Sequence, residues 1–101
     1  EYSPIFIYNF MRSKSGKFFE PYLLDKFFKI FGVWPINTIV RLSDGKIAIV
    51  REQNEDDIFS PKVEVVEPKE EKIIDLKENK DIKIIDFLSP FLEGSKYIDL
   101  I

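Results

Sequence analysis

The sequence of 101 residues contains neither cysteine nor histidine. Without cysteine, disulfide bonds and thiolate chemistry are excluded, and without histidine the chain lacks the commonest metal ligand and the usual general base near neutral pH. The 4 glycines are scattered singly, so no glycine-rich phosphate loop is present. Serine nucleophiles have no imidazole to activate them. We therefore expect no catalytic residue, no cofactor and no metal site, and no enzyme activity in this chain.

Membrane and nucleic-acid partners are also not expected. No apolar run reaches the roughly 18–20 residues of a membrane helix, and the N-terminus lacks the basic-then-apolar order of a signal peptide, which predicts a cytoplasmic protein. Residues 1–50 carry seven Lys/Arg and four Asp/Glu, whereas residues 51–101 carry eight and fourteen. Because nucleic-acid affinity needs cations against phosphates, the acidic second half is a poor surface for it.

Carboxylates are densest in the polar segment 51–61, which ends in a proline and is interpreted as a loop. The segment lacks the regularly alternating oxygen ligands and the turn glycine of a calcium loop. We interpret its acidic residues as solvated side chains rather than ligands: Glu52, Glu55, Asp56 and Asp57.

Apolar side chains are abundant, with 45% hydrophobic residues and 10 phenylalanines. Ser3-Pro4 and Pro21 predict two helix starts, and Gly32 predicts the end of the second helix. Two short helices cannot cover the wide apolar stripe of the second one, which must pack on the following sheet, on another chain or on helices upstream. The candidate interface or packing residues are Phe27, Phe28, Phe31 and Trp34.

From residue 36 the apolar period changes to two, which is typical of strands. Asp44-Gly45 predicts a two-residue hairpin turn between strands 38–42 and 46–51. This turn pairs Leu42 with Ile47, Val40 with Ile49 and Ile39 with Val50. The residues then expected on one face are Val40, Leu42, Ile47 and Ile49.

Segment 62–67 alternates and predicts a third strand. The pattern Lys-apolar-Ile-Asp-apolar recurs at 72–76, 83–87 and 96–100, a spacing typical of short strands, although coincidence in a chain rich in these residues is an alternative. The predicted fold class is α+β, with two N-terminal helices and a small antiparallel sheet or barrel of about five strands. We expect a helical segment at 1–32 and a small β module at 33–101.

Trp34-Pro35, between the helices and the strands, has two interpretations. The indole is either a plug that packs where helix meets sheet, or an exposed anchor for a peptide or nucleotide. In the second interpretation Trp34 and Arg41 are the candidate ligand-binding residues.

The segment FFEPYLLDKFFKIFGVWPINTIVRLSDGKIAIV resembles the C-terminal border of HD-GYP proteins, the bacterial cyclic di-GMP phosphodiesterases. The matching positions of the helical part and of the β part are Phe19, Pro21, Leu24, Phe28, Gly32 and Pro35, and then Val40, Arg41, Leu42, Gly45 and Val50. Weaker matches are Ser3-Pro4, Pro61-Lys62-Val63 and Ile74-Asp75-Leu76, so the resemblance covers about residues 3–86. Departures are Trp34 for the usual tyrosine, Ile36-Asn37 for Pro-Gly, and Ala48 for a glycine.

The resemblance implies a non-catalytic accessory module of a cyclic di-GMP signalling protein. The family's His-Asp metal ligands and Gly-Tyr-Pro loop have no counterpart here, so no catalytic residue is carried over. The expected partner is an upstream catalytic domain or another chain, with a homodimer as one form. The alternative is a ligand-binding module for a nucleotide or a peptide on the small β-barrel.

Overall fold

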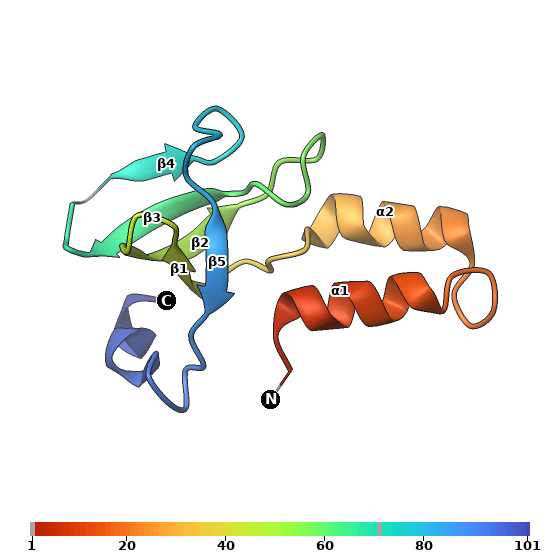
Figure 1. Ribbon diagram of the computed structural model, residues 1–101, viewed down its shortest axis with the longest axis horizontal. Helices are drawn as coiled ribbons and strands as arrows, with labels where there is room; N and C mark the ends of the chain where they lie inside the picture. The colour runs from red at the N-terminus through yellow and green to blue at the C-terminus, as the bar shows by residue number, and fades with distance from the viewer. Residues whose placement is uncertain (1, 71) are drawn as a thin grey trace.

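The computed structural model describes residues 2–70 and 72–101, which fold into a helical hairpin followed by an antiparallel sheet of five strands (Figure 1). The hairpin projects from one end of the sheet, and the molecule measures 43 × 30 × 20 Å. The predicted α+β class is confirmed. The elements in chain order are α1 (Pro4–Ser13), α2 (Pro21–Phe31), β1 (Ile39–Leu42), β2 (Ile47–Glu52), β3 (Lys62–Glu67), β4 (Ile73–Asp75), β5 (Ile84–Phe87) and the 3-10 helix η1 (Ser95–Leu100).

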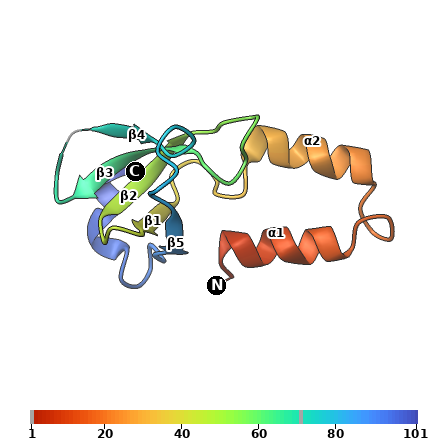
Figure 2. The same cartoon turned by 45° about the horizontal axis from the view of Figure 1, so that its top comes forward.

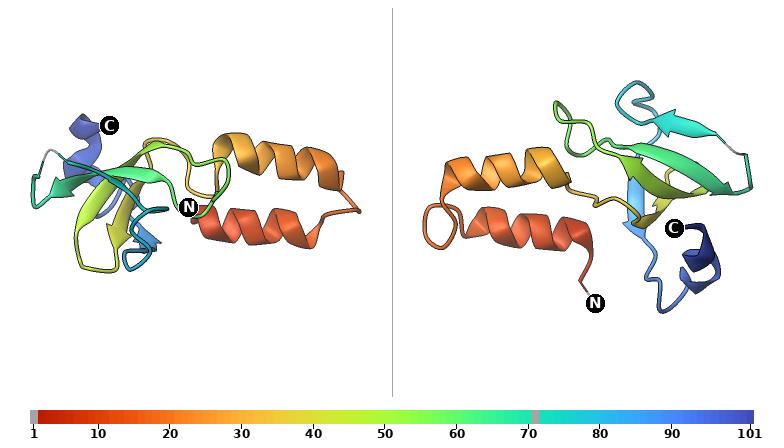
Figure 3. Two further views of the ribbon diagram at one scale, coloured as in Figure 1. Left: turned by 90° about the horizontal axis from the view of Figure 1, so that it is seen from above. Right: turned by 180° about the vertical axis from the view of Figure 1, so that it is seen from behind.

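Both helices begin, and α2 ends, where local chemistry predicts. The Ser3 hydroxyl accepts a hydrogen bond from the Phe6 amide at 3.2 Å, and the Glu20 carboxylate accepts one from the Leu23 amide at 2.7 Å. Each cap precedes a proline whose missing N–H costs nothing in the first turn. α2 ends at Gly32, whose φ of 69° is readily adopted by glycine. The helices lie side by side and antiparallel (Figure 3).

The sheet has the strand order β4-β3-β2-β1-β5, so β4 and β5 form its two edges (Figure 2). Every neighbouring pair in this order is antiparallel. Within the described residues the strands therefore form an open sheet. Of the two predicted architectures, a sheet and a barrel, the structure has the sheet.

The predicted register of the first hairpin is wrong by one residue. The Leu42 amide bonds the Lys46 carbonyl at 2.8 Å, so the loop consists of Ser43, Asp44 and Gly45 rather than two residues. Gly45 takes a φ of 89°, the left-handed position that closes such a loop. The observed pairs are Ile39 with Ile49, Val40 with Ala48, and Arg41 with Ile47.

The corrected register changes which β2 side chains share a face with β1, because side chains alternate along a strand. One face carries a first core, in which Val63 and Val65 of β3 lie inward as predicted. The other face carries a second core around the isoleucines of β1 and β2. The strand residues of the first core are Val40, Leu42, Ala48, Val50, Val63, Val65 and Ile74, and the second core contains Ile39, Ile47, Ile49, Leu88 and Tyr97.

The repeated pattern forms strands in its first two copies but a 3-10 helix in its third, which corrects the strand expected at 96–100. The second face of the sheet needs a cover, and η1 supplies it by burying Tyr97. The Tyr97 hydroxyl donates a hydrogen bond to Glu67, and Arg51 Nη2 donates to the Leu100 carbonyl at 2.5 Å. A strand at this place would leave the isoleucines of the second core exposed.

We expect Gly45→Ala to lower the free energy of unfolding by about 1–2 kcal/mol, because a Cβ is unfavourable at this φ. Gly45→Asn is the matched variant and is expected to cost less, since asparagine tolerates left-handed backbone. Urea unfolding followed by circular dichroism measures both values. Equal costs for the two variants would contradict the loop geometry as the cause.

Candidate functional site

The joint between hairpin and sheet is held by a short strap, residues 32–35. Gln53 Nε2 donates to the Trp34 carbonyl at 2.9 Å, and the Val33 amide donates to the Ile58 carbonyl at 3.0 Å. A Cβ on Gly32 would lie 1.9 Å from Gln53 Oε1, so glycine alone lets the amide of Gln53 approach the strap. The strap therefore sets where the hairpin leaves the sheet.

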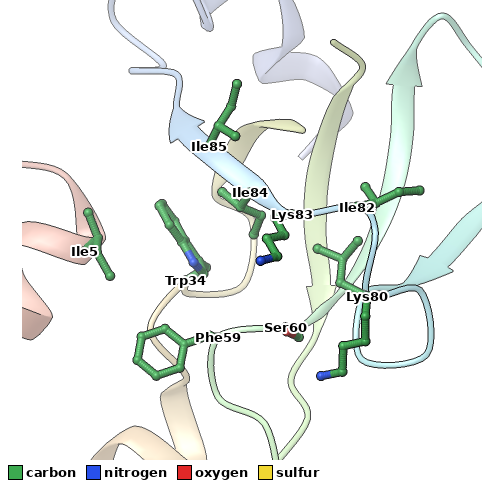
Figure 4. A pocket seen from close by; sticks show the side chains of 10 residues that line it. Ile5, Trp34, Phe59, Ser60, Lys80, Ile82, Lys83, Ile84 and Ile85 are labelled. Carbon is green, nitrogen blue, oxygen red and sulfur yellow. The ribbon is translucent and has the colours of Figure 1, made fainter. Parts of the chain in front are cut away.

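Trp34 is 6% exposed and belongs to the first core, in the position that the plug interpretation describes. One side of the residue also lines a cleft of about 500 Å³, which we name the joint cleft (Figure 4). A cleft of this size is within the range of small-molecule sites. Its apolar lining residues are Ile5, Trp34, Phe59, Leu76, Ile82, Ile84 and Ile85, and its polar ones are Ser60, Lys80 and Lys83.

The two lysines of the joint cleft differ in their partners. Lys80 Nζ lies 2.5 Å from Asp57 Oδ2, and this bond, together with one from Ser60, lowers the pKa of the Asp57 carboxyl. Lys83 forms no ion pair with any described residue, and its ammonium points into the cleft toward Trp34 (Figure 4). Lys83 is thus the cation of the cleft that remains available to an anionic ligand.

The helical hairpin carries a second candidate surface. Phe27 and Phe31, at 41% and 52% exposure, lie on the outside of α2 with their ring centroids 4.8 Å apart and their ring planes tilted by 44°. Phe28 instead turns inward and meets Tyr8 of α1 edge to face at 4.8 Å. We call the exposed apolar residues of the two helices and their loop the hairpin face: Phe6, Ile7, Phe10, Phe18, Tyr22, Leu23, Phe27, Ile30 and Phe31.

A groove of about 400 Å³ lies within this surface. It runs between the two helices near their connecting loop, and Glu20 is its one charged lining residue. Its apolar lining residues are Met11, Phe18, Phe19, Leu23, Leu24 and Phe27.

Cations lie close to aromatic rings of the hairpin face. Lys14 Nζ lies 5.8 Å from the Phe10 ring centre and Lys26 Nζ lies 5.0 Å from that of Tyr22. Arg12 is paired with Asp25 at 2.6 Å, which raises the pKa of the guanidinium. Residues 2–32 contain five Lys/Arg and two Asp/Glu, so the hairpin is positively charged.

Trp34 and Arg41 do not meet. Arg41 is exposed and alternates along β1 with Val40 and Leu42 of the first core, so it lies on the opposite face from Trp34. The two candidate ligand-binding residues therefore line no common cavity. Sequence reasoning missed Phe59 and Lys83 as cleft residues. Phe59 lies in the segment 51–61, interpreted as a polar loop, and the only signal at Lys83 is the short strand predicted at 83–87.

The acidic segment is engaged with lysines. Glu52 pairs with Lys62 at 3.3 Å, and Asp56 pairs with Lys77. Within the described part of the chain, no three carboxylates converge into a group able to hold a metal ion. Nor does any helix described there have the length and hydropathy to cross a bilayer.

Comparison with models of protein families, with curated proteins and with solved structures gives no match to this chain.

A double-mutant cycle can test the contact between Gly32 and Gln53 in the strap. Gly32→Ala should cost about 2 kcal/mol of unfolding free energy, from left-handed strain plus displacement of Gln53, and Gln53→Ala about 1 kcal/mol from the lost hydrogen bond. The double variant should be about 1 kcal/mol more stable than the sum of the two single costs predicts. In that variant the Gln53 amide, which the new Cβ at position 32 would displace, has already been removed. Denaturant unfolding followed by the fluorescence of Trp34 measures the cycle, and strict additivity would contradict the strap.

The ion pair of Asp57 predicts a pH dependence. Because the folded-state pKa lies below the ordinary 3.8, the charged carboxylate stabilises the fold above pH 3.8, and this contribution is lost as the pH falls through the lowered pKa. Asp57→Asn should therefore be less stable than the parent at pH 7, with a difference that shrinks in acid. Thermal unfolding from pH 7 to 2.5 measures it, with Asp81→Asn as the exposed control that should show no such convergence.

Proposed function

We propose that this chain is a non-catalytic docking module whose hairpin face seats against an apolar helical surface of a neighbouring domain. The resemblance in the sequence makes that neighbour the catalytic domain of a cyclic di-GMP phosphodiesterase of the HD-GYP type. One observation carries the proposal: both helices turn large apolar side chains to the solvent on the same hairpin.

The hairpin buries too little apolar surface to account for its composition. Within the described range 2–70, α1 buries no residue and α2 buries Leu24 and Phe28. Helices of 10 and 11 residues are marginal in water, and their stability normally comes from packing an apolar face. Large contiguous apolar patches on soluble proteins mark interaction sites. A covering partner would supply the packing that the sheet does not.

Charge favours a different partner over a second copy of the hairpin. Residues 2–32 carry a net charge of +3, so two hairpin faces brought together would place like charges around one apolar contact. An acidic rim on the partner would instead meet Lys14, Lys17 and Lys26. The proposal therefore commits to an apolar helical surface with an acidic rim, and the homodimer becomes an outcome of the test.

The docking experiment supplies an HD-GYP catalytic domain from the same genome in trans and follows complex formation by sedimentation velocity. We expect a one-to-one complex that Leu23→Glu or Phe31→Glu weakens at least tenfold, because each buries a charge in the apolar contact. Ile73→Glu, an equally exposed isoleucine on β4, is the matched control and should bind normally.

Three results would overturn the proposal. They are the absence of a complex, equal weakening by the hairpin and β4 variants, and a stable homodimer that excludes the catalytic domain. The chain alone should also leave cyclic di-GMP intact in the presence of manganese, and turnover would contradict its non-catalytic character.

A further inference from the structure

We infer that the joint cleft is a binding site for a small amphipathic carboxylate, whose apolar body packs in the cleft while its single negative charge meets Lys83. The inference concerns a surface separate from the hairpin face and does not depend on the docking function.

The walls of the cleft suit an apolar ligand body. Trp34, Phe59 and Ile5 come from the strap, the loop before β3 and α1, and they stand across from the isoleucines of β5 and its preceding loop (Figure 4). Ile85 is 60% exposed, which leaves apolar area to be removed from water by a ligand. The cleft of about 500 Å³ leaves room for the apolar body of a small ligand.

The charges of the cleft select one negative charge rather than several. Lys83 is available, whereas Lys80 and Ser60 are engaged by Asp57. The Asp57 carboxylate at that end of the cleft would repel a second anionic group. A nucleotide would need several cations or a row of backbone N–H groups for its phosphates, and the cleft offers one unpaired ammonium. A monocarboxylate matches this arrangement.

An extended peptide added to the neighbouring sheet edge fits less well. β5 is a strand of four residues, and the Phe87 amide already donates to the Asp86 carboxylate at 2.8 Å. The Asp86 carboxylate accepts the hydrogen bond of the Phe87 amide and places a negative charge beside the strand. Both effects disfavour pairing of β5 with another strand. The edge is therefore protected, and the cleft beside it is the part open to a ligand.

Octanoate is the probe, and the fluorescence of Trp34 is the readout, because it is the only tryptophan in the chain and lines the cleft. We expect saturable binding with a Kd on the order of 0.1–1 mM, as befits a ligand of about ten heavy atoms. Octanol, which lacks the charge, should bind at least fivefold more weakly, and octylammonium more weakly still.

Lys83→Met keeps the apolar stem and removes the charge of an exposed side chain, so the fold should be retained. It should weaken octanoate at least fivefold and leave octanol unchanged. Lys62→Met, at a lysine paired with Glu52 away from the cleft, is the matched control and should change neither affinity. Phe31→Glu on the hairpin face should also bind octanoate normally, which separates this site from docking.

The inference is overturned if octanoate and octanol bind equally, if Lys83→Met binds octanoate like the parent, or if the fluorescence of Trp34 shows no saturation. It is also overturned if Phe31→Glu abolishes binding, since the probe would then occupy the hairpin face.

Discussion

The pairing of β1 with β2 is the constraint on which the rest of the molecule depends. The loop closed by Gly45 sets the register, and the register decides which side chains of β2 point to each face of the sheet. One face thereby receives Trp34 and the valines of β3, while the other receives Tyr97 from η1. A shift of the register by one residue would turn Ala48 and Val50 of β2 to the face of Tyr97, and Ile47 and Ile49 to the face of Trp34. Neither Trp34 nor Tyr97 would then meet the surface against which it packs.

The joint between hairpin and sheet follows from this arrangement. Trp34 can be buried in the first core only if the chain leaves α2 sharply, and Gly32 and Gln53 provide that exit. Tyr8 of α1 contacts Phe59 at 5.2 Å between ring centres, so the hairpin touches the sheet region at its base and extends away from it. The same geometry creates the joint cleft at the base and leaves the outer helical surfaces uncovered.

The two candidate surfaces differ in the ligand chemistry that suits them. The hairpin face is wide, aromatic and rimmed by several cations, which suits a large apolar partner surface with acidic neighbours. The joint cleft is small, lined by rings and isoleucines, and holds one unpaired ammonium, which suits a small monoanion. A ligand in the cleft would contact both Ile5 of the hairpin and Ile84 of the sheet, and would thus tie the two parts together.

Local features could be predicted from the sequence alone: the helix starts at Ser3-Pro4 and Pro21, the helix end at Gly32, and the strand at Lys62–Glu67. Each of these depends on backbone groups within a few residues, so composition and spacing were enough. The sequence also indicated that the hairpin carries more apolar surface than it can bury. It could not separate a two-residue turn from the three-residue loop at Gly45, because both use Asp-Gly.

The remaining features depend on contacts between segments that are distant in the sequence. The third copy of the repeated pattern became η1 because the second core required a cover for its isoleucines, a requirement that no local pattern records. Trp34 and Arg41 are apart because Arg41 lies on the face of β1 opposite to Val40 and Leu42, which share the first core with Trp34. Lys83 reaches the cleft beside Trp34 through the pairing of β5 with β1. Such long-range contacts depend on which segment packs against which face of the sheet, so only the folded chain shows which side chains form a site.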